Sequence, residues 1–145
     1  MSFQECIKFA NDNYPCYIAT VDGDQPRVRP IGLWYADEKG FYIQTQSVKS
    51  FSKQMGEHPK IEICFHAAGE GSQLGKVMRV SGKVKPVTDA IMLAKCIEER
   101  PFLKAMGIET LDNPLLSVFH LYTGEAFFWT QADSMKEAQI PRIKF

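Results

Sequence analysis

The chain has 145 residues, of which 45% are apolar, and it carries 17 basic and 17 acidic side chains. Its length predicts a single domain over residues 1–145, and its apolar content excludes disordered, collagen-like and coiled-coil classes. A formal net charge of zero argues against nucleic-acid binding, which needs an excess of Lys and Arg to displace counterions. Any anion site must therefore be a local cluster of basic side chains.

The four cysteines predict neither a metal site nor a disulfide framework. Cys6, Cys16, Cys64 and Cys96 form no CxxC pair, and no histidine stands at metal-ligand spacing from them. We expect reduced, buried thiols. No run approaches the ~18 apolar residues of a membrane span, and the N-terminus has no signal-peptide pattern. These features predict a cytoplasmic protein with no membrane contact.

The first half of the chain predicts one helix followed by strands. Ser2 and Glu5 fit a capping box at the start of a helix that ends before Pro15. Asp22-Gly23-Asp24 and residues 36–40 have the composition of tight turns. The strands they separate form a predicted meander, in which Pro30 disfavours a central position. The predicted strands are 16–21, 26–35 and 41–45.

The second half alternates short helices with strands. Ser47 is the expected N-cap of a helix over 47–56, and residues 67–75 are a Gly-rich loop. The remaining predicted elements are strands at 61–65 and 77–85, a helix at 88–100, a turn at 102–107, and a final hairpin of 115–122 and 125–130 about Thr123-Gly124. Tight turns between consecutive strands disfavour a parallel fold. We expect an α+β fold built on an antiparallel barrel with a few short peripheral helices.

A basic cluster is the candidate site. The period-2 geometry of a strand places Arg27, Arg29 and Ile31 on one face. The strand that ends at Thr45 continues into a helix start that contains Lys49 and other polar side chains, Ser47 and Ser50 among them. Free N–H groups and the positive end of a helix favour phosphate, and an arginine fork favours it further. Arg79 is a further candidate for the rim.

The same residues permit a purely structural interpretation. Arg-x-Arg is also typical of the solvent face of an edge strand, where charge blocks aggregation. Ser47 is explained equally well as an N-cap, and Lys49 as part of a solvated helix face. Spacing alone leaves both interpretations open.

Several segments in order resemble one known family. They are Cys16-Tyr-Ile-Ala-Thr20, Gln25-Pro-Arg-Val-Arg-Pro-Ile31, Phe41-Tyr-Ile-Gln-Thr45 with Lys49-Ser50, His58-Pro59, and Met78-Arg-Val-Ser-Gly-Lys83. The chain resembles the pyridoxamine 5'-phosphate oxidase-like family of FMN-binding split β-barrels. The likeness runs from the first helix through Val84 and continues more loosely to Phe145. It implies a split barrel and FMN as the cofactor.

The resemblance also implies roles for individual residues. The Arg29 strand would bind the FMN phosphate and run its backbone beneath the flavin through Pro30 and Ile31. Gln44 and Thr45 would close the ribityl-phosphate end, with Lys49 and Ser50 on the phosphate. Members of the family are typically homodimers with the flavin at the subunit interface, so an aromatic side chain of the partner, from Phe127, Phe128 or Trp129, would cover the ring.

Two departures from the family bear on activity. Vitamin B6-forming oxidases carry a basic residue at the end of the Arg strand and a C-terminal Arg/His segment for the substrate phosphate. Here the strand ends Gly32-Leu-Trp-Tyr35, and the tail from 139 to 145 contains a single arginine, Arg142, and no histidine. We therefore expect no oxidation of pyridoxamine phosphate. Trp34 and Tyr35 would instead place an aromatic surface near the cofactor.

The sequence thus predicts an FMN-dependent oxidoreductase of a small organic substrate, with no catalytic residue assigned. One alternative is a non-catalytic module that binds or senses a flavin, a deazaflavin or haem. Another is a barrel without a ligand. The predicted cofactor-binding residues are Arg27, Arg29, Pro30, Ile31, Gln44, Thr45, Lys49, Ser50, Arg79 and Trp129.

Overall fold

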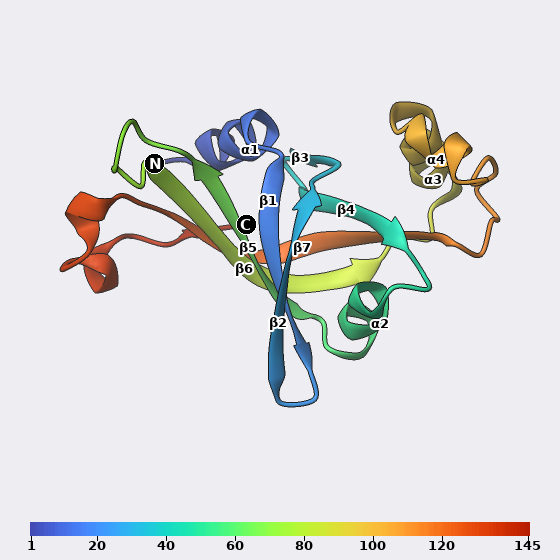
Figure 1. Ribbon diagram of the computed structural model, residues 1–145, viewed down its shortest axis with the longest axis horizontal. Coiled ribbons are helices and arrows are strands. Elements are labelled where there is room, and N and C mark those ends of the chain that lie inside the picture. The colour runs from blue at the N-terminus through green and yellow to red at the C-terminus, as the bar shows by residue number, and fades with distance from the viewer.

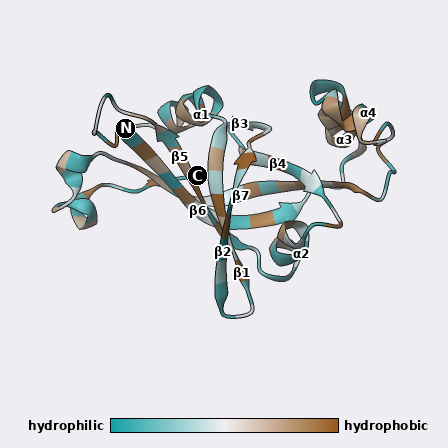
Figure 2. Cartoon of the chain, viewed as in Figure 1, coloured by the Kyte–Doolittle hydropathy of each residue, from teal (hydrophilic) through white to brown (hydrophobic).

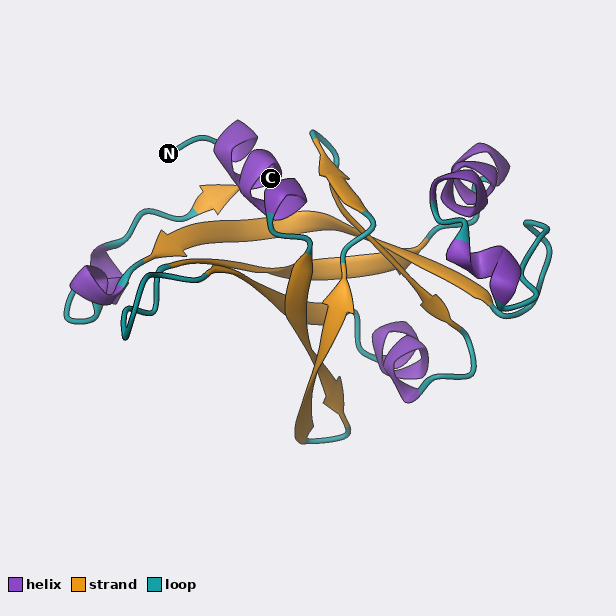
Figure 3. Ribbon diagram, turned by 45° about the horizontal axis from the view of Figure 1, so that its top comes forward, coloured by secondary structure: helices purple, strands orange, loops and turns teal.

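The computed structural model describes residues 1–145 and consists of one curled antiparallel sheet of eight strands with four short helices at its margins (Figures 1 and 3). This arrangement confirms the predicted α+β split barrel. The strands are β1 (Pro15–Asp22), β2 (Gln25–Gly32), β3 (Tyr35–Asp37), β4 (Gly40–Gln46), β5 (Lys60–Ala67), β6 (Lys76–Pro86), β7 (Leu116–Trp129) and β8 (Ile143–Lys144). The helices are α1 (Phe3–Asp12), α2 (Ser50–Glu57), α3 (Ala90–Glu99) and α4 (Phe102–Ala105), and two 3-10 turns, η1 (Gln131–Asp133) and η2 (Glu137–Gln139), follow β7.

Two residues join the two edges of the sheet. The strand order is β2-β1-β5-β6-β7-β4-β3, with β8 paired to β7, so β2 and β3 lie at opposite ends. At about 4.8 Å per strand, a flat sheet of this order would hold its edges about 29 Å apart. Only Leu33 and Trp34 separate the end of β2 from the start of β3, a connection that reaches about 11 Å at most. The sheet therefore curls into an open barrel that brings β2 back toward β4.

The predicted meander is consequently wrong in its third strand. β2 pairs only with β1, and β4 pairs with β7 and β3. The predicted strand over 26–35 also divides, because the chain leaves β2 at Gly32 and re-enters the sheet at Tyr35. The edge position expected from Pro30 is confirmed, since β2 is the first strand of the sheet. Figure 2 colours much of the projecting end of the β1–β2 hairpin as hydrophilic.

The final hairpin is also wrong, because residues 116–129 form one continuous strand. In β7, Gly124 lies opposite Gly82 of β6, and a Cβ on Gly124 would stand 2.0 Å from the Ser81 carbonyl oxygen. Here glycine does not form a turn. It allows two backbones to approach closely, which is a common role of glycine within strands. The Thr123-Gly124 dipeptide has the composition of a turn but the geometry of a strand crossing.

The helix boundaries agree with the sequence where side chains cap them. The Ser2 hydroxyl accepts from the Glu5 N–H at 3.3 Å, and the Glu5 carboxylate accepts from the Ser2 N–H at 2.5 Å, which confirms the capping box. Asp89 caps α3 by accepting from the Met92 N–H. Ser47 does not cap α2, because its hydroxyl donates to the Pro114 carbonyl and the helix begins at Ser50 with Lys49 as N-cap.

Two hydrophobic clusters hold the fold. The larger one fills the barrel and includes Ile18, Phe41, Phe65 and Leu121. A separate cluster of five buried residues packs α3 and α4 against the start of β7: Cys96, Ile97, Leu103, Ile108 and Val118. This second cluster fixes the α3–α4 segment beside the open side of the barrel. None of the helices is long and apolar enough to span a bilayer.

Gly124→Ala should destabilise the fold. The added Cβ would meet the Ser81 carbonyl at 2.0 Å and the Cα of Gly82 at 2.8 Å, so β6 and β7 would have to separate. We expect the free energy of unfolding in urea to fall by on the order of 1–3 kcal/mol. Gly56→Ala, in α2, is the matched control: its Cβ meets nothing within 4 Å, and we expect a gain of about 0.5–1 kcal/mol. Equal effects of the two changes would contradict the close crossing.

Candidate functional site

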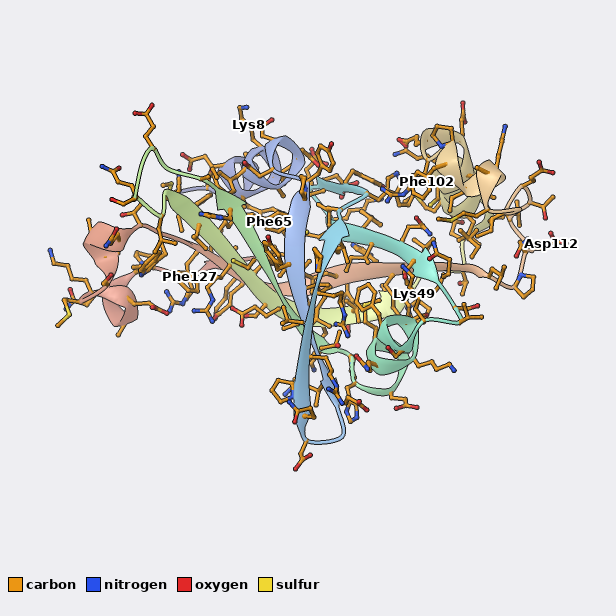
Figure 4. The ribbon with its side chains drawn as sticks, in the orientation of Figure 1. Lys8, Lys49, Phe65, Phe102, Asp112 and Phe127 are labelled. Atoms are coloured by element: carbon orange, nitrogen blue, oxygen red, sulfur yellow. The ribbon has the colours of Figure 1, made fainter.

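The curl of the sheet creates a cavity of about 300 Å³ between β2, β4 and the start of α2, with α3–α4 at its side. We call it the basic pocket. Six of the predicted site residues line it, namely Arg29, Pro30, Ile31, Gln44, Thr45 and Lys49. The other lining residues are Gly32, Gln46, Phe51, Arg100, Phe102 and Met106. Figure 4 shows Lys49 and Phe102 on this side of the molecule. The predicted residues of β2 and β4 therefore lie around one cavity. They come together because the sheet curls, and not because β2 and β4 are neighbouring strands.

The pocket is positively charged and contains no acidic side chain. Arg29, Lys49 and Arg100 line it, and none of the twelve lining residues is Asp or Glu. None of these three cations takes part in the ion pairs of the structure. Three cations around one cavity repel one another unless an anion lies between them. The pocket is therefore suited to a phosphate or carboxylate group.

Arg29 is fixed by neutral groups. Its Nη1 donates to the Thr20 hydroxyl at 2.6 Å and to the Ile18 carbonyl at 3.4 Å, and its Nη2 donates to Gln54 Oε1 at 2.7 Å. Its guanidinium also lies 4.7 Å above the Phe51 ring. Burial lowers the pKa of Arg29, and the nearby charge of Arg27 lowers it further. No carboxylate offsets the charge of Arg29.

Arg100 is a pocket residue that the sequence analysis missed. It ends α3, where its Nε donates to Gln44 Oε1 at 3.0 Å and its Nη2 to the Gly32 carbonyl at 3.4 Å. It also lies 4.9 Å from the centre of the Phe102 ring. Burial lowers its pKa, again without an acidic partner. In the sequence, its position before Pro101 indicates only where a helix ends. Its place beside the pocket depends on how the second hydrophobic cluster packs α3 in space.

Thr45 contributes a buried hydroxyl without a partner. Its Oγ1 is inaccessible to solvent and makes no hydrogen bond, although Thr45 is one of the residues that line the basic pocket. The neighbouring Gln44 has a partner at both ends of its amide, because Nε2 donates to the Thr45 carbonyl at 2.9 Å and Oε1 accepts from Arg100. Buried polar groups rarely lack a partner. The Thr45 hydroxyl is therefore an unsatisfied polar group within the single chain.

The other four predicted residues do not line this pocket. Arg27 is exposed and pairs with Asp22 at 3.3 Å, and Ser50 is exposed at the start of α2. Arg79 contacts Glu62 at 2.6 Å and Glu137 at 3.2 Å. The hydrogen bond that Arg79 donates to Glu62 raises the pKa of Arg79, whereas burial lowers that of Arg29. The charge of Arg79 is thus already compensated within the chain.

Trp129 lines a second cavity, of about 440 Å³, between the end of β7 and the C-terminal segment. Its indole Nε1 is buried and has no hydrogen-bond partner. The two cavities share no lining residue, and Phe127, two residues before Trp129, lies on the opposite side of the molecule from Lys49 in Figure 4. Within one chain, Trp129 therefore does not reach the basic pocket.

Trp34 and Tyr35 are also outside the pocket. Tyr35 stacks on Tyr42 at 4.5 Å, and Tyr42 stacks on His120 at 4.3 Å. Trp34 meets the Tyr35 ring edge-on at 4.8 Å and packs against the second hydrophobic cluster. These contacts give the aromatic pair a packing role in the single chain.

Comparisons with known proteins agree with this fold. The family model described as pyridoxamine 5'-phosphate oxidase matches residues 3–130. The chain therefore belongs to the pyridoxamine 5'-phosphate oxidase family. A curated relative, the pyridoxine/pyridoxamine 5'-phosphate oxidase of Azorhizobium caulinodans, is 34% identical over 94 residues, which are 61% of this chain and 42% of the relative. The match thus spans less than half the length of that relative.

Solved structures share the whole architecture. A NimC/NimA family protein from Clostridium acetobutylicum superposes with a TM-score of 0.76 at 26% identity, covering 98% of this chain and 92% of that one. The haem storage protein HutZ of Vibrio cholerae gives 0.66 at 16%, covering 90% and 95%. An FAD-binding protein of Mesorhizobium loti gives 0.63 at 19%, covering 84% and 90%. At identities this low, the last two show the fold alone.

The unpaired Thr45 hydroxyl gives a stability prediction. We expect Thr45→Val to leave the free energy of unfolding of the ligand-free protein unchanged or to raise it, because a buried unpaired polar group costs about 1–3 kcal/mol. Thr20→Val is the matched control: it removes a hydroxyl with two hydrogen bonds and should lower stability by about 1 kcal/mol or more. Urea denaturation measures both. An equal loss in the two variants would show that the Thr45 hydroxyl is not free.

Proposed function

We propose that this chain is an FMN-binding flavoprotein whose basic pocket holds the phosphate of the cofactor. The observation that carries the proposal is the cluster of three cations that line the basic pocket without an acidic neighbour. Membership of the pyridoxamine 5'-phosphate oxidase family supports it, and so does the fold shared with an FAD-binding protein. A phosphate monoester supplies two negative charges and the acceptor oxygens that these donors lack.

The chain offers a distinct group for each part of such a ligand. Arg29 would bind the phosphate with its planar fork, and Lys49 would add a point charge at the positive end of α2. Thr45, with Gln44, would close the ribityl-phosphate end. Arg100 approaches from the α3 side and, through Gln44, holds the end of β4 in place. Pro30 and Ile31, which also line the cavity, would support the rest of the ligand from β2.

The cavity is small for a whole flavin, since pockets for ligands of this size range from roughly 300 to 1,000 Å³. We therefore propose a homodimer, in which a second copy completes the site and covers the ring. Trp129, with its unpaired indole N–H, is the residue we expect the partner copy to supply. Bound FMN would provide two-electron redox chemistry, while the protein provides binding and orientation.

We further propose an oxidoreductase that acts on a small organic substrate other than pyridoxamine phosphate. The segment from the last residue of β2 to the first of β3, Gly32-Leu-Trp-Tyr35, lacks the basic residue of vitamin B6-forming oxidases, and the tail has one arginine, Arg142, and no histidine. That arginine lies on the Phe127 ring at 3.7 Å and donates to the Ile140 carbonyl. It is therefore engaged in holding the C-terminal segment.

The non-catalytic alternative remains a binding module for a flavin or for haem. Haem requires an axial ligand, which is usually His, Cys or Tyr, or Met in combination with His. No His, Cys or Tyr lines the basic pocket, whose only sulfur belongs to Met106. The donor set of this pocket therefore favours a phosphate-bearing flavin over haem.

Titration with FMN, followed by quenching of flavin fluorescence, tests the pocket. We expect Arg29→Ala and Lys49→Ala each to weaken FMN binding by about 1.5–3 kcal/mol, because each removes a charged hydrogen bond to phosphate. Arg79→Ala is the matched control, since Arg79 is paired with Glu62 and Glu137 outside the pocket, and it should leave the affinity unchanged. A wild-type protein that ignores FMN would overturn the proposal, and an effect confined to Arg79→Ala would place the phosphate elsewhere.

Turnover separates the enzyme from the binding module. With FMN bound, we expect the protein to oxidise NADH or NADPH catalytically in air. The rate is measured as the fall in the absorbance of the reduced nicotinamide, at a saturating concentration of NADH or NADPH. The Arg29→Ala variant should lose this rate in proportion to its lost FMN. Stoichiometric binding of FMN without turnover, across a panel of reductants and small electron acceptors, would favour the non-catalytic module.

A further inference from the structure

We propose that Gln54 and Thr20 position the Arg29 guanidinium without neutralising it, and that this neutral clamp makes the basic pocket prefer a phosphorylated ligand over its unphosphorylated form. This inference rests on the proposed FMN site. Neither residue lines the pocket, so both act through Arg29 and are positioning residues.

The clamp is buried behind the pocket. Thr20, on β1, is 1% exposed, and Gln54, on α2, is 7% exposed. Thr20 Oγ1 lies 2.6 Å from Gln54 Oε1 and 2.6 Å from Arg29 Nη1, and Gln54 Oε1 lies 2.7 Å from Arg29 Nη2. The three side chains form a closed triangle of hydrogen bonds, with Phe51 packed against the guanidinium.

The direction of each hydrogen bond follows from chemistry. Arginine has only donors, so Thr20 and Gln54 both accept from Arg29. The Thr20 hydroxyl has one proton left, which it donates to Gln54 Oε1. The amide oxygen of Gln54 therefore accepts two hydrogen bonds, and the orientation of that amide is determined. Arg29 is held at two of its nitrogen atoms by groups that carry no charge.

A carboxylate at the same position would make a stronger contact with Arg29. Glutamate has the same shape as glutamine, and a charged acceptor roughly doubles the strength of such a hydrogen bond. A buried carboxylate would also cancel the charge that the pocket presents. Arg79 shows this other arrangement, because Glu62 and Glu137 hold it and compensate it. The amide at residue 54 keeps Arg29 both oriented and fully cationic.

The test compares FMN with riboflavin, which lacks the phosphate. We expect Gln54→Glu to weaken FMN binding by about tenfold or more, equivalent to about 1.4 kcal/mol, while riboflavin binding changes less than about twofold. Thr20→Val should weaken FMN binding by about three- to tenfold, and Thr20→Ser, which keeps the hydroxyl, should restore it. Fluorescence titration gives each affinity, and far-UV circular dichroism confirms that each variant is folded.

Gln73→Glu provides the matched control, because it makes the same change in net charge on an exposed loop outside the basic pocket. It should leave both affinities unchanged. If Gln54→Glu binds FMN as tightly as the wild type does, the clamp is refuted while the flavin site stands. Equal losses of FMN and riboflavin would assign Gln54 a merely structural role, which also refutes the inference. A wild-type protein that binds neither flavin would refute the proposed function itself.

Discussion

The short connection between β2 and β3 is the constraint on which this structure depends. Since two residues link strands at opposite edges of the sheet, the sheet has no flat alternative and must curl. Five strands separate β2 from β3 in the pairing order, and β4 is the strand next to β3. The curl nevertheless places the end of β2 beside the end of β4. Backbone hydrogen bonds from Leu33 to Tyr14 and from Trp34 to Tyr42 hold the connection in place. The basic pocket is thus a direct result of the strand order.

Local features of the fold were predictable because local chemistry determines them. The capping box at Ser2 and Glu5, the edge position required by Pro30, and the turn at Gly23, whose φ is 64°, all depend on residues close in sequence. The place of β4 was not predictable, because it pairs mainly with β7, whose partner residues lie from 70 (Gln46 with Leu116) to 80 (Phe41 with Leu121) positions later. The predicted turn at Thr123-Gly124 was wrong for a related reason. The requirement for glycine there comes from Ser81 on another strand.

The candidate site shows the same division. Sequence spacing and the family resemblance gathered Arg29, Gln44, Thr45 and Lys49, and the structure brings them to one cavity. Arg100 escaped notice because its position depends on how α3 packs, which only the second hydrophobic cluster determines. The chain as a whole has a formal net charge of zero. The pocket is positive because basic side chains line it and no carboxylate does. Arg79 and Arg29 are the same residue type, and only their neighbours distinguish a structural cation from one available to a ligand.

The helices α3 and α4 lie in the long connection from β6 to β7, and their buried contacts form a small cluster separate from the barrel interior. The connection nevertheless supplies Arg100, Phe102 and Met106 to the rim of the cavity. One wall of the site therefore rests on a hydrophobic cluster separate from the barrel core and packed against the start of β7. Exchange or remodelling of that wall would alter which molecules enter while the barrel and the Arg29 side of the cavity persist, so diversification of ligand choice requires no redesign of the scaffold.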